Sequence, residues 1–355
     1  MLFQRDGHVK AWAFGLLLVS APWSILAADR NAYLRTDLVS NQSGGAPTTD
    51  PKLVNAWGLV FNPYGPAWVA DNGTGVSTLY DGQGTKVPLE VTIPGQKPTG
   101  VVYFGGTSGF PVNGTPSRFI FASETGTLDA WAPPLGNTAV TVARTAGAIY
   151  KGLALAGNGR GFFLYATDFH NGRIDVYDAN FKPVNLPLDP QKPTCNFSDP
   201  QLPAGYAPFG IQTLNGNLYV TYAKQDPNKE DDVPGVGNGF VDLFDPNGCL
   251  LSRLARRGRL NSPWGLVIAP ANFGRFGNHL LVGNFGDGAI NAFDPVTHAF
   301  RGQLRGADGR RLTIDGLWAL VFGNGTSAQP TSTLFFTAGP DEEANGRYGK
   351  IEPAP

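Results

Sequence analysis

The stretch Ser262–Pro270, SPWGLVIAP, followed after a short loop by His279–Pro295, HLLVGNFGDGAINAFDP, decides the fold of this chain. It predicts three short strands separated by two turns, because apolar β-rich runs are broken by Gly, Asn and Asp. Two features define the unit. The first is an apolar run with a small residue near its start, and the second is a later strand that ends in an aromatic residue and Asp.

Versions of this unit recur along the whole chain, which makes six in total. The other five begin with the apolar runs Trp57–Phe61, Thr99–Phe104, Lys151–Ala156, Phe209–Leu214 and Leu317–Gly323. The small residues of the six runs are Gly58, Gly100, Gly152, Gly210, Gly265 and Ala319, which stand 42, 52, 58, 55 and 54 positions apart. Such a period with several strands per unit is typical of a β-propeller. We therefore predict an all-β fold, a six-bladed β-propeller of four-stranded antiparallel blades.

The two ends of the repeat array are complementary. The last unit stops before a fourth strand, whereas Tyr33–Val39 precedes the first unit and has no inner strand of its own. We predict that Tyr33–Val39 is the outermost strand of the last blade. This pairing closes the ring and removes its exposed edges.

The N-terminus has the pattern of a secretory signal. Arg5 and Lys10 precede the apolar run Ala11–Val19, and Ser24–Ala28 offers small residues for cleavage. The run is short for a membrane span, although a retained anchor helix is the alternative. We predict a signal peptide at residues 1–28, a single propeller domain at residues 29–355, and a periplasmic or secreted location.

Composition limits the partners. The chain has 27 basic and 28 acidic residues, a net charge of −1, which does not suggest nucleic acid or an anionic membrane as partner. We expect no membrane span after signal cleavage, and a monomer. Cys195 and Cys249 form a disulfide or remain two buried thiols; an oxidising compartment permits the disulfide, and the sequence leaves both open.

One face of the disc collects the candidate site. In a four-stranded antiparallel blade, the start of the innermost strand and the end of the second strand lie on the same face. The predicted ligand-binding residues at these positions are Trp57, Asp71, Asn72, Glu124, Lys151, Asp168, His170, Trp264, Asn284 and Trp318. Aromatic residues with a polar rim suit a small molecule such as a sugar or phenol. The alternative is that the tryptophans pack between blades.

The carboxylates and amides of this face are also candidate ligands of Ca²⁺ or another divalent cation, which takes oxygen ligands. The alternative is that Asp and Asn before Gly cap tight turns. Only His170 among the four histidines is placed on this face, so a multi-histidine metal centre is not predicted. The chain has no GxSxG, P-loop, HExxH or CxxCH motif.

Two insertions interrupt the repeats. Pro187–Gly205 is proline-rich and joins the third and fourth units, and Lys224–Asn238 is acidic, then glycine-rich. Because Lys224–Asn238 leaves the end of a second strand, we predict that it overhangs the site face as a mobile flap. Solvated decoration is the alternative.

Several motifs together resemble a family of exported bacterial proteins of unassigned function. They include LVSNQSGGAPTTDPKLVNAWGL at Leu38–Leu59, YATDFHNGRIDVYD at Tyr165–Asp178 and LLVGNFGDGAINAFDP at Leu280–Pro295. The resemblance covers about Leu38 to the C-terminus and implies a propeller related to NHL-repeat and TolB-like proteins. It implies no catalytic residues.

A more distant likeness is to six-bladed gluconolactonase-type hydrolases, which hold a divalent cation at the axis. Only Asn55 and Asp315-Gly316 resemble that pattern, and Trp57, Lys151 and Trp264 stand where Asn is expected. Virginiamycin-lyase-like propellers use a catalytic His, for which His170 is the candidate here.

Three functions follow as hypotheses. The first is a propeller that binds a small molecule or a protein partner on its axial face. The second is a divalent-metal-dependent hydrolase or lyase at the axis, and the third is a structural module of an envelope or extracellular assembly. Fold alone does not decide between them.

Overall fold

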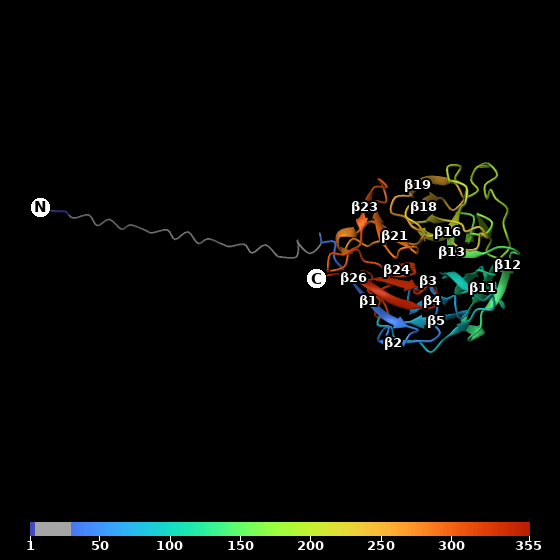
Figure 1. Ribbon diagram of the computed structural model, residues 1–355, viewed down its shortest axis with the longest axis horizontal. Helices are drawn as coiled ribbons and strands as arrows, with labels where there is room; N and C mark the ends of the chain where they lie inside the picture. The colour runs from blue at the N-terminus through green and yellow to red at the C-terminus, as the bar shows by residue number, and fades with distance from the viewer. Residues whose placement is uncertain (4–29) are drawn as a thin grey trace.

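The computed structural model describes residues 1–3 and 30–355, and it confirms the predicted six-bladed β-propeller. Six small antiparallel sheets follow one another around a central axis in chain order (Figure 1). The innermost strand of each blade contacts that of the next blade, and the innermost strand of the sixth contacts that of the first. The predicted signal peptide falls almost entirely outside the described residues.

Within each blade, successive strands lie progressively farther from the axis. Blade one consists of β3 (Ala56–Phe61), β4 (Ala67–Asp71), β5 (Val76–Tyr80) and β6 (Val91–Thr92). Blade two consists of β7 (Pro98–Tyr103), β10 (Phe119–Ser123), β11 (Thr127–Trp131) and β12 (Val140–Arg144). It also carries the small hairpin β8 (Pro111–Val112) and β9 (Thr115–Pro116) and the 3-10 turn η2 (Pro133–Leu135). Blade three consists of β13 (Tyr150–Gly157), β14 (Phe162–Asp168) and β15 (Arg173–Tyr177).

The second half of the ring repeats the plan. Blade four consists of β16 (Tyr206–Leu214), β17 (Asn217–Lys224), β18 (Phe240–Phe244) and β19 (Leu250–Arg256). Blade five consists of β20 (Pro263–Ile268), η3 (Gly274–Phe276), β21 (Leu280–Asn284), β22 (Ile290–Phe293) and β23 (Phe300–Gln303). Blade six consists of β24 (Leu317–Phe322), β25 (Leu334–Ala338), β26 (Arg347–Pro353) and β1 (Tyr33–Ser40), to which β2 (Thr48–Thr49) adds in parallel.

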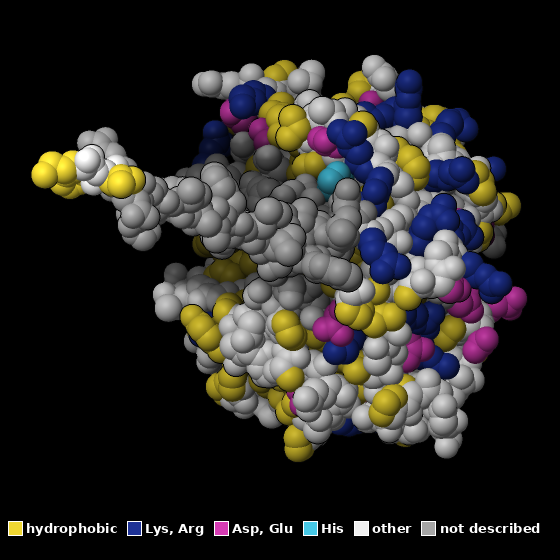
Figure 2. Space-filling view, turned by 90° about the vertical axis from the view of Figure 1, so that its left-hand side faces the viewer, with side chains coloured by type: hydrophobic (Ala, Val, Ile, Leu, Met, Phe, Trp, Pro, Cys, Tyr) yellow, Lys and Arg dark blue, Asp and Glu magenta, His cyan; other side chains and the backbone are white. Residues whose placement is uncertain are grey.

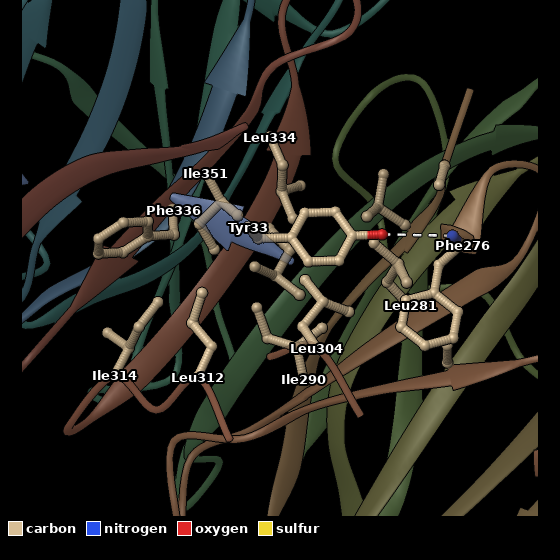
Figure 3. Packing of buried hydrophobic residues seen from close by; sticks show 14 of the residues in the cluster. Tyr33, Phe276, Leu281, Ile290, Leu304, Leu312, Ile314, Leu334, Phe336 and Ile351 are labelled. Carbon is tan, nitrogen blue, oxygen red and sulfur yellow. Dashed lines mark hydrogen bonds between the residues drawn. The ribbon is translucent and has the colours of Figure 1, made fainter. Parts of the chain in front are cut away.

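The first strand closes the ring, as predicted. β1 pairs antiparallel with β26 from Tyr33 opposite Pro353 to Ser40 opposite Arg347, so the blue and red ends of the ribbon share one sheet (Figure 1). Tyr33 is buried, and its hydroxyl donates to the Phe273 carbonyl and accepts from the Phe276 amide. Its ring lies among apolar side chains of blades five and six (Figure 3).

The third blade departs from the prediction of four strands. After β15 only single bridges follow, Tyr177 to Pro183 and the Val184 amide to the Val176 carbonyl. The chain then enters Pro187–Gly205, whose prolines lack the amide that a further ladder needs. A disulfide between Cys195 and Cys249 ties this segment to the turn after β18, which resolves the alternative that the sequence left open.

The blades pack so closely at the axis that the repeated small residue is a steric requirement. A Cβ on Gly100 would lie 2.2 Å from the Leu153 amide nitrogen, and one on Gly210 would lie 2.2 Å from the Trp264 carbonyl oxygen. The obstacle is in each case the inner strand of the next blade. Glycine at this position therefore lets neighbouring inner strands approach each other.

Seven apolar clusters form the core. Six of them each join two adjacent blades, for example Trp68 of blade one with Phe119 and Trp131 of blade two. The seventh lies at the axis and is described below. In the described part of the chain, no helix has both the length and the apolar character needed to span a bilayer.

Candidate functional site

Aromatic side chains from several blades meet at the axis. Trp57 of β3 and Trp318 of β24 are both buried and stack with ring centroids 3.6 Å apart. Trp264 of β20 meets both rings edge-on at 6.3 and 5.8 Å, and Phe285 stacks on the other side of Trp318 at 4.0 Å. Phe209 of β16 contacts Trp318 at 5.8 Å. These five residues are called the axial aromatic cluster below.

Four of the five cluster members arise from one repeat position, the residue directly before the small residue of each inner strand, and Phe285 follows β21. Four of the six blades place an aromatic residue there, and blades two and three place Thr99 and Lys151. The Thr99 hydroxyl donates to the Tyr150 carbonyl of the next blade at 2.8 Å, so it joins blades together. Lys151 is thus the one cation in this ring of six positions.

Lys151 is almost completely buried, with 2% of its side chain exposed. Its ammonium donates to Glu124 Oε1 at 2.5 Å and to Asp231 Oδ1 at 3.0 Å, and it lies 5.2 Å from the centroid of the Trp57 ring. Burial alone would lower the pKa of Lys151, but the carboxylates of Glu124 and Asp231 outweigh it and raise the pKa above its ordinary value. The ammonium therefore stays charged, which does not suit an amine nucleophile.

A chain of hydrogen bonds connects the cluster to this ion pair. Trp318 Nε1 donates to Asn55 Oδ1, Asn55 Nδ2 donates to Asn72 Oδ1, and Asn72 Nδ2 donates to Glu124 Oε2. On the other side, Trp264 Nε1 donates to the Lys151 carbonyl. Burial would raise the pKa of Glu124, but Lys151 and Asn72 hold it below its ordinary value. The network fixes the rings and the charged groups relative to one another.

The insertion Lys224–Asn238, the flap, lies over this site and not on the opposite face. Asp231 reaches the Lys151 ammonium, and Gly235 donates its amide to Asn261 Oδ1 of the segment before β20 at 2.6 Å. Lys224 itself ends β17 opposite Tyr206, at the start of the inner strand β16.

A cavity of about 250 Å³ remains between the flap and the axial aromatic cluster. Its lining residues are Trp57, Lys151, Phe209, Asp231, Asp232, Pro234, Phe285, Trp318, Glu342 and Glu343. The floor is aromatic and the walls carry four carboxylates against one ammonium. Deeper along the axis, the inner strands leave a space of about 20 Å³, enough for about one water molecule.

Two of the wall carboxylates are held in poorly solvated positions. Burial raises the pKa of Asp232 to about 6, and the Ser262 side chain and the Lys151 ammonium oppose this rise. Burial also raises the pKa of Glu343 to about 7; the Lys151 ammonium opposes this rise, and the Glu124 and Asp231 carboxylates add to it. In both groups the cost of burial outweighs the partners that favour the charged form.

The structure brings together six of the ten predicted site residues. Trp57, Lys151 and Trp318 line the cavity, Glu124 and Asn72 belong to the hydrogen-bond network behind it, and Trp264 packs against the stacked rings.

Three predicted residues are instead hydrogen-bonded to nearby strands and loops. Asp71 accepts from the amide and hydroxyl of Thr78 in β5, and Asp168 accepts from the amide and side chain of Asn171. Asn284 donates to the Arg259 carbonyl and to Asp287. All three lie outside the cavity lining, and the bonds of Asp168 with Asn171 and of Asn284 with Asp287 match the turn-capping alternative.

His170 lies beside the base of the flap. Gln225 Nε2 donates to the Phe169 carbonyl at 2.5 Å and to the His170 carbonyl at 3.4 Å. The Nδ1 atom of His170 is buried without a hydrogen-bond partner among residues 1–3 and 30–355. His170 is absent from the cavity lining.

Sequence reasoning missed four acidic residues of the wall. Asp231 and Asp232 were assigned only to the flap, and Glu342 and Glu343 follow β25 in an irregular loop. A further residue, Asn55, was noted only for a distant likeness. The one signal in the sequence that could have indicated these acidic pairs is their position next to strand ends on the site face.

The wall carboxylates are spread around the cavity. Within residues 1–3 and 30–355, no three His, Cys, Asp or Glu side chains are grouped closely enough to hold a metal ion. The carboxylates are also a local feature. The side of the molecule in Figure 2 shows clearly more Lys and Arg than Asp and Glu, and the whole chain carries a net charge of only −1.

Comparison with known proteins identifies sequence relatives of viral origin. No family model matches the chain. Two uncharacterised proteins of Acanthamoeba polyphaga mimivirus are each 34% identical to it. One aligns over 329 residues, 88% of this chain and 78% of that protein, and the other over 332 residues, 88% and 84%.

Solved structures agree with the fold. Virginiamycin B lyase from Staphylococcus aureus matches 90% of this chain and 98% of its own, with a TM-score of 0.52 and 13% identity. A protein of unknown function from Bacteroides thetaiotaomicron covers 90% and 76%, with a TM-score of 0.56 and 11% identity. A glucose dehydrogenase covers 90% and 100%, with a TM-score of 0.54 and 14% identity. At such identities the likeness shows the fold alone.

Proposed function

This chain belongs to one family with the two uncharacterised mimivirus proteins, and we propose that it is an exported β-propeller that binds a small molecule in its axial cavity. The observation that carries the proposal is the cavity of about 250 Å³ between the flap and the axial aromatic cluster. Concave sites with an aromatic floor and a few placed polar groups are the usual form of small-molecule sites.

Two features support export. The N-terminal residues have the order of a secretory signal, with basic residues, an apolar run and small residues in sequence. The disulfide between Cys195 and Cys249 is of a kind that persists in oxidising compartments.

A ligand screen tests the binding function. Thermal-shift measurements with a library of small metabolites on the wild-type protein are expected to give hits that raise the melting temperature. Phe285→Ala removes a ring that lines the cavity and stacks on Trp318, so these shifts should shrink. Phe300→Ala is the matched control. Phe300 lies in β23 outside the cavity lining and is 46% exposed, so this variant should keep the shifts in melting temperature.

Two results would contradict the proposal. Equal shifts in wild type and Phe285→Ala for every hit would place binding elsewhere. The absence of any hit would favour a structural module instead.

A further inference from the structure

We propose that the axial cavity selects an organic cation, a ligand whose amine or quaternary ammonium group sits between the aromatic floor and the acidic wall. This inference rests on the proposed binding function and adds the chemical class of the ligand.

The first argument is charge. The cavity is lined by Asp231, Asp232, Glu342 and Glu343, and the only cation of its lining, Lys151, is already paired with Glu124 behind it. With every group ionised, the five carboxylates and one ammonium sum to −4, and with Glu343 protonated, as its raised pKa of about 7 allows near neutral pH, they sum to −3. This excess lies inside a protein whose net charge is −1. A cationic ligand would compensate it, and an anionic ligand would add to the repulsion.

The second argument is that the acidic wall keeps free capacity to accept hydrogen bonds. Asp231 uses only its Oδ1 atom for Lys151 and has 75% of its side chain exposed beside the cavity, and Asp232 has the neutral Ser262 hydroxyl beside it but no ion pair within the described residues. Carboxylates in a poorly solvated site gain free energy from an added N–H donor. An amine supplies such donors at the flap side of the cavity.

The third argument is the floor. Trp57, Trp318 and Phe285 stack along the cavity, and because Trp57 and Trp318 are almost wholly buried, the partly exposed Phe285 ring offers the most accessible aromatic face. Aromatic faces attract ammonium groups, most strongly where water is excluded. The protein itself places one ammonium in this environment, because Lys151 lies 5.2 Å from the Trp57 centroid.

Geometry separates this ligand class from a bare metal ion. A metal such as Ca²⁺ needs several oxygen atoms within about 2.5 Å of one point. In the part of the chain that the structure describes, no three acidic, His or Cys side chains are grouped in that way. Carboxylates spread around an aromatic-floored cavity suit a cation whose charge is distributed over a larger body.

Pairs of isosteric probes test the charge directly. Titration calorimetry near neutral pH and at low salt compares choline with uncharged 3,3-dimethylbutan-1-ol, and phenethylamine with 2-phenylethanol. At least one ammonium probe is expected to bind about tenfold more tightly than its neutral partner, a difference of about 1.4 kcal/mol. Asp231→Asn and Glu342→Gln should each weaken that binding severalfold. Asp308→Asn, a similarly exposed acid outside the cavity, should leave it unchanged.

The outcomes distinguish this inference from the proposed function. If a neutral partner binds as tightly as its ammonium probe, or if no ammonium probe binds while the metabolite screen gives Phe285-dependent hits, the cation class is wrong and the binding site stands. If the screen also gives no hit, both fail together. Tight binding of Ca²⁺ that competes with the probes would assign the wall to a metal instead.

Discussion

At the scale of single residues, the buried ion pair between Lys151 and Glu124 is the most consequential contact of the site. Lys151→Met would leave the Glu124 carboxylate in a poorly solvated position without its cation. We expect the free energy of unfolding to fall by about 3 kcal/mol, because breaking one half of a buried pair costs far more than losing a surface pair. Urea denaturation measures this loss.

The double variant Lys151→Met/Glu124→Gln should recover part of it, since no buried charge remains unpaired. Lys350→Met, which breaks the more exposed pair with Glu352, is the control and should cost less than about 1 kcal/mol. Additive losses at Lys151 and Glu124 would contradict the coupling.

Glu343 predicts how stability depends on pH. Burial raises its pKa from an ordinary value of 4.5 to about 7, so between these values the folded protein holds a proton that the unfolded chain releases. The free energy of unfolding should therefore fall as pH rises through this window. Asp232 acts in the same direction, up to its pKa of about 6. Glu124, with a lowered pKa, contributes stability that is lost only at more acidic pH.

Denaturation midpoints at several pH values between about 5 and 8 measure this slope. Glu343→Gln should make it less steep, with a remainder from Asp232 and from Asp242, whose pKa burial raises to about 7, whereas the exposed neighbour Glu342→Gln should leave it unchanged. An unchanged slope in Glu343→Gln would refute the assignment.

At the scale of elements, the flap is held over the site by contacts of unequal strength. The ion pair of Asp231 with Lys151 has a largely exposed acidic partner, so it contributes less than a buried pair. Residues 227–231 are all exposed. We therefore expect a protease of broad specificity to cut within Lys224–Asn238 before it cuts any blade, with fragments identified by mass spectrometry.

Asp231→Asn should increase the rate of this first cut severalfold, because cleavage follows the population of the open flap. Asp308→Asn serves again as control. The other long segment, Pro187–Gly205, should resist longer because the disulfide and the Arg253 ion pair with Asp199 hold it. Initial cleavage in a blade or in that segment would show that the flap is not the weak point.

The elements also show what the sequence could and could not predict. Inner strands were predictable, because close packing at the axis demands a small residue in every blade and so leaves a visible repeat. The turn role of Asp168 and Asn284 could not be separated from a site role, since a side chain at a strand end can point to its own turn or to the axis. Asp232 and Glu343 stand outside the repeat, so only the folded loops bring them to the cavity. The absence of a fourth strand in blade three could not be predicted either, because the irregular segment after β15 does not follow the repeat pattern.

At the scale of the whole molecule, stability depends on the contact between the first and last strands. Tyr33 of β1 is buried between blades five and six and makes two hydrogen bonds with the segment around η3. Tyr33→Ala should lower the free energy of unfolding by about 4 kcal/mol, as expected for loss of a large buried ring. Removal of Asn31–Ser40 should cost more, because the whole ladder with β26 is lost.

Leu34→Ala is the matched control, since Leu34 neighbours Tyr33 in β1 but has 46% exposure, and it should change stability by about 0.5 kcal/mol or less. Denaturant unfolding curves of Tyr33→Ala, Leu34→Ala and the Asn31–Ser40 deletion measure these changes in the free energy of unfolding. A deletion variant with an unaltered melting temperature would mean that the ring does not need this strand.

The closed ring also sets an order of events in time. Contacts such as Asn41 with Asn345 and Ser40 with Arg347 join residues 304 and 307 positions apart, so they form only after Asn345 and Arg347 have been made. At about 5–20 residues per second, β26 is made roughly 15–60 seconds after β1. The axial cavity also forms late, because its floor stacks Trp57 of the first blade on Trp318 of the last. The binding site thus forms only after the first and last blades have come together, and occupancy of the cavity reports that they have.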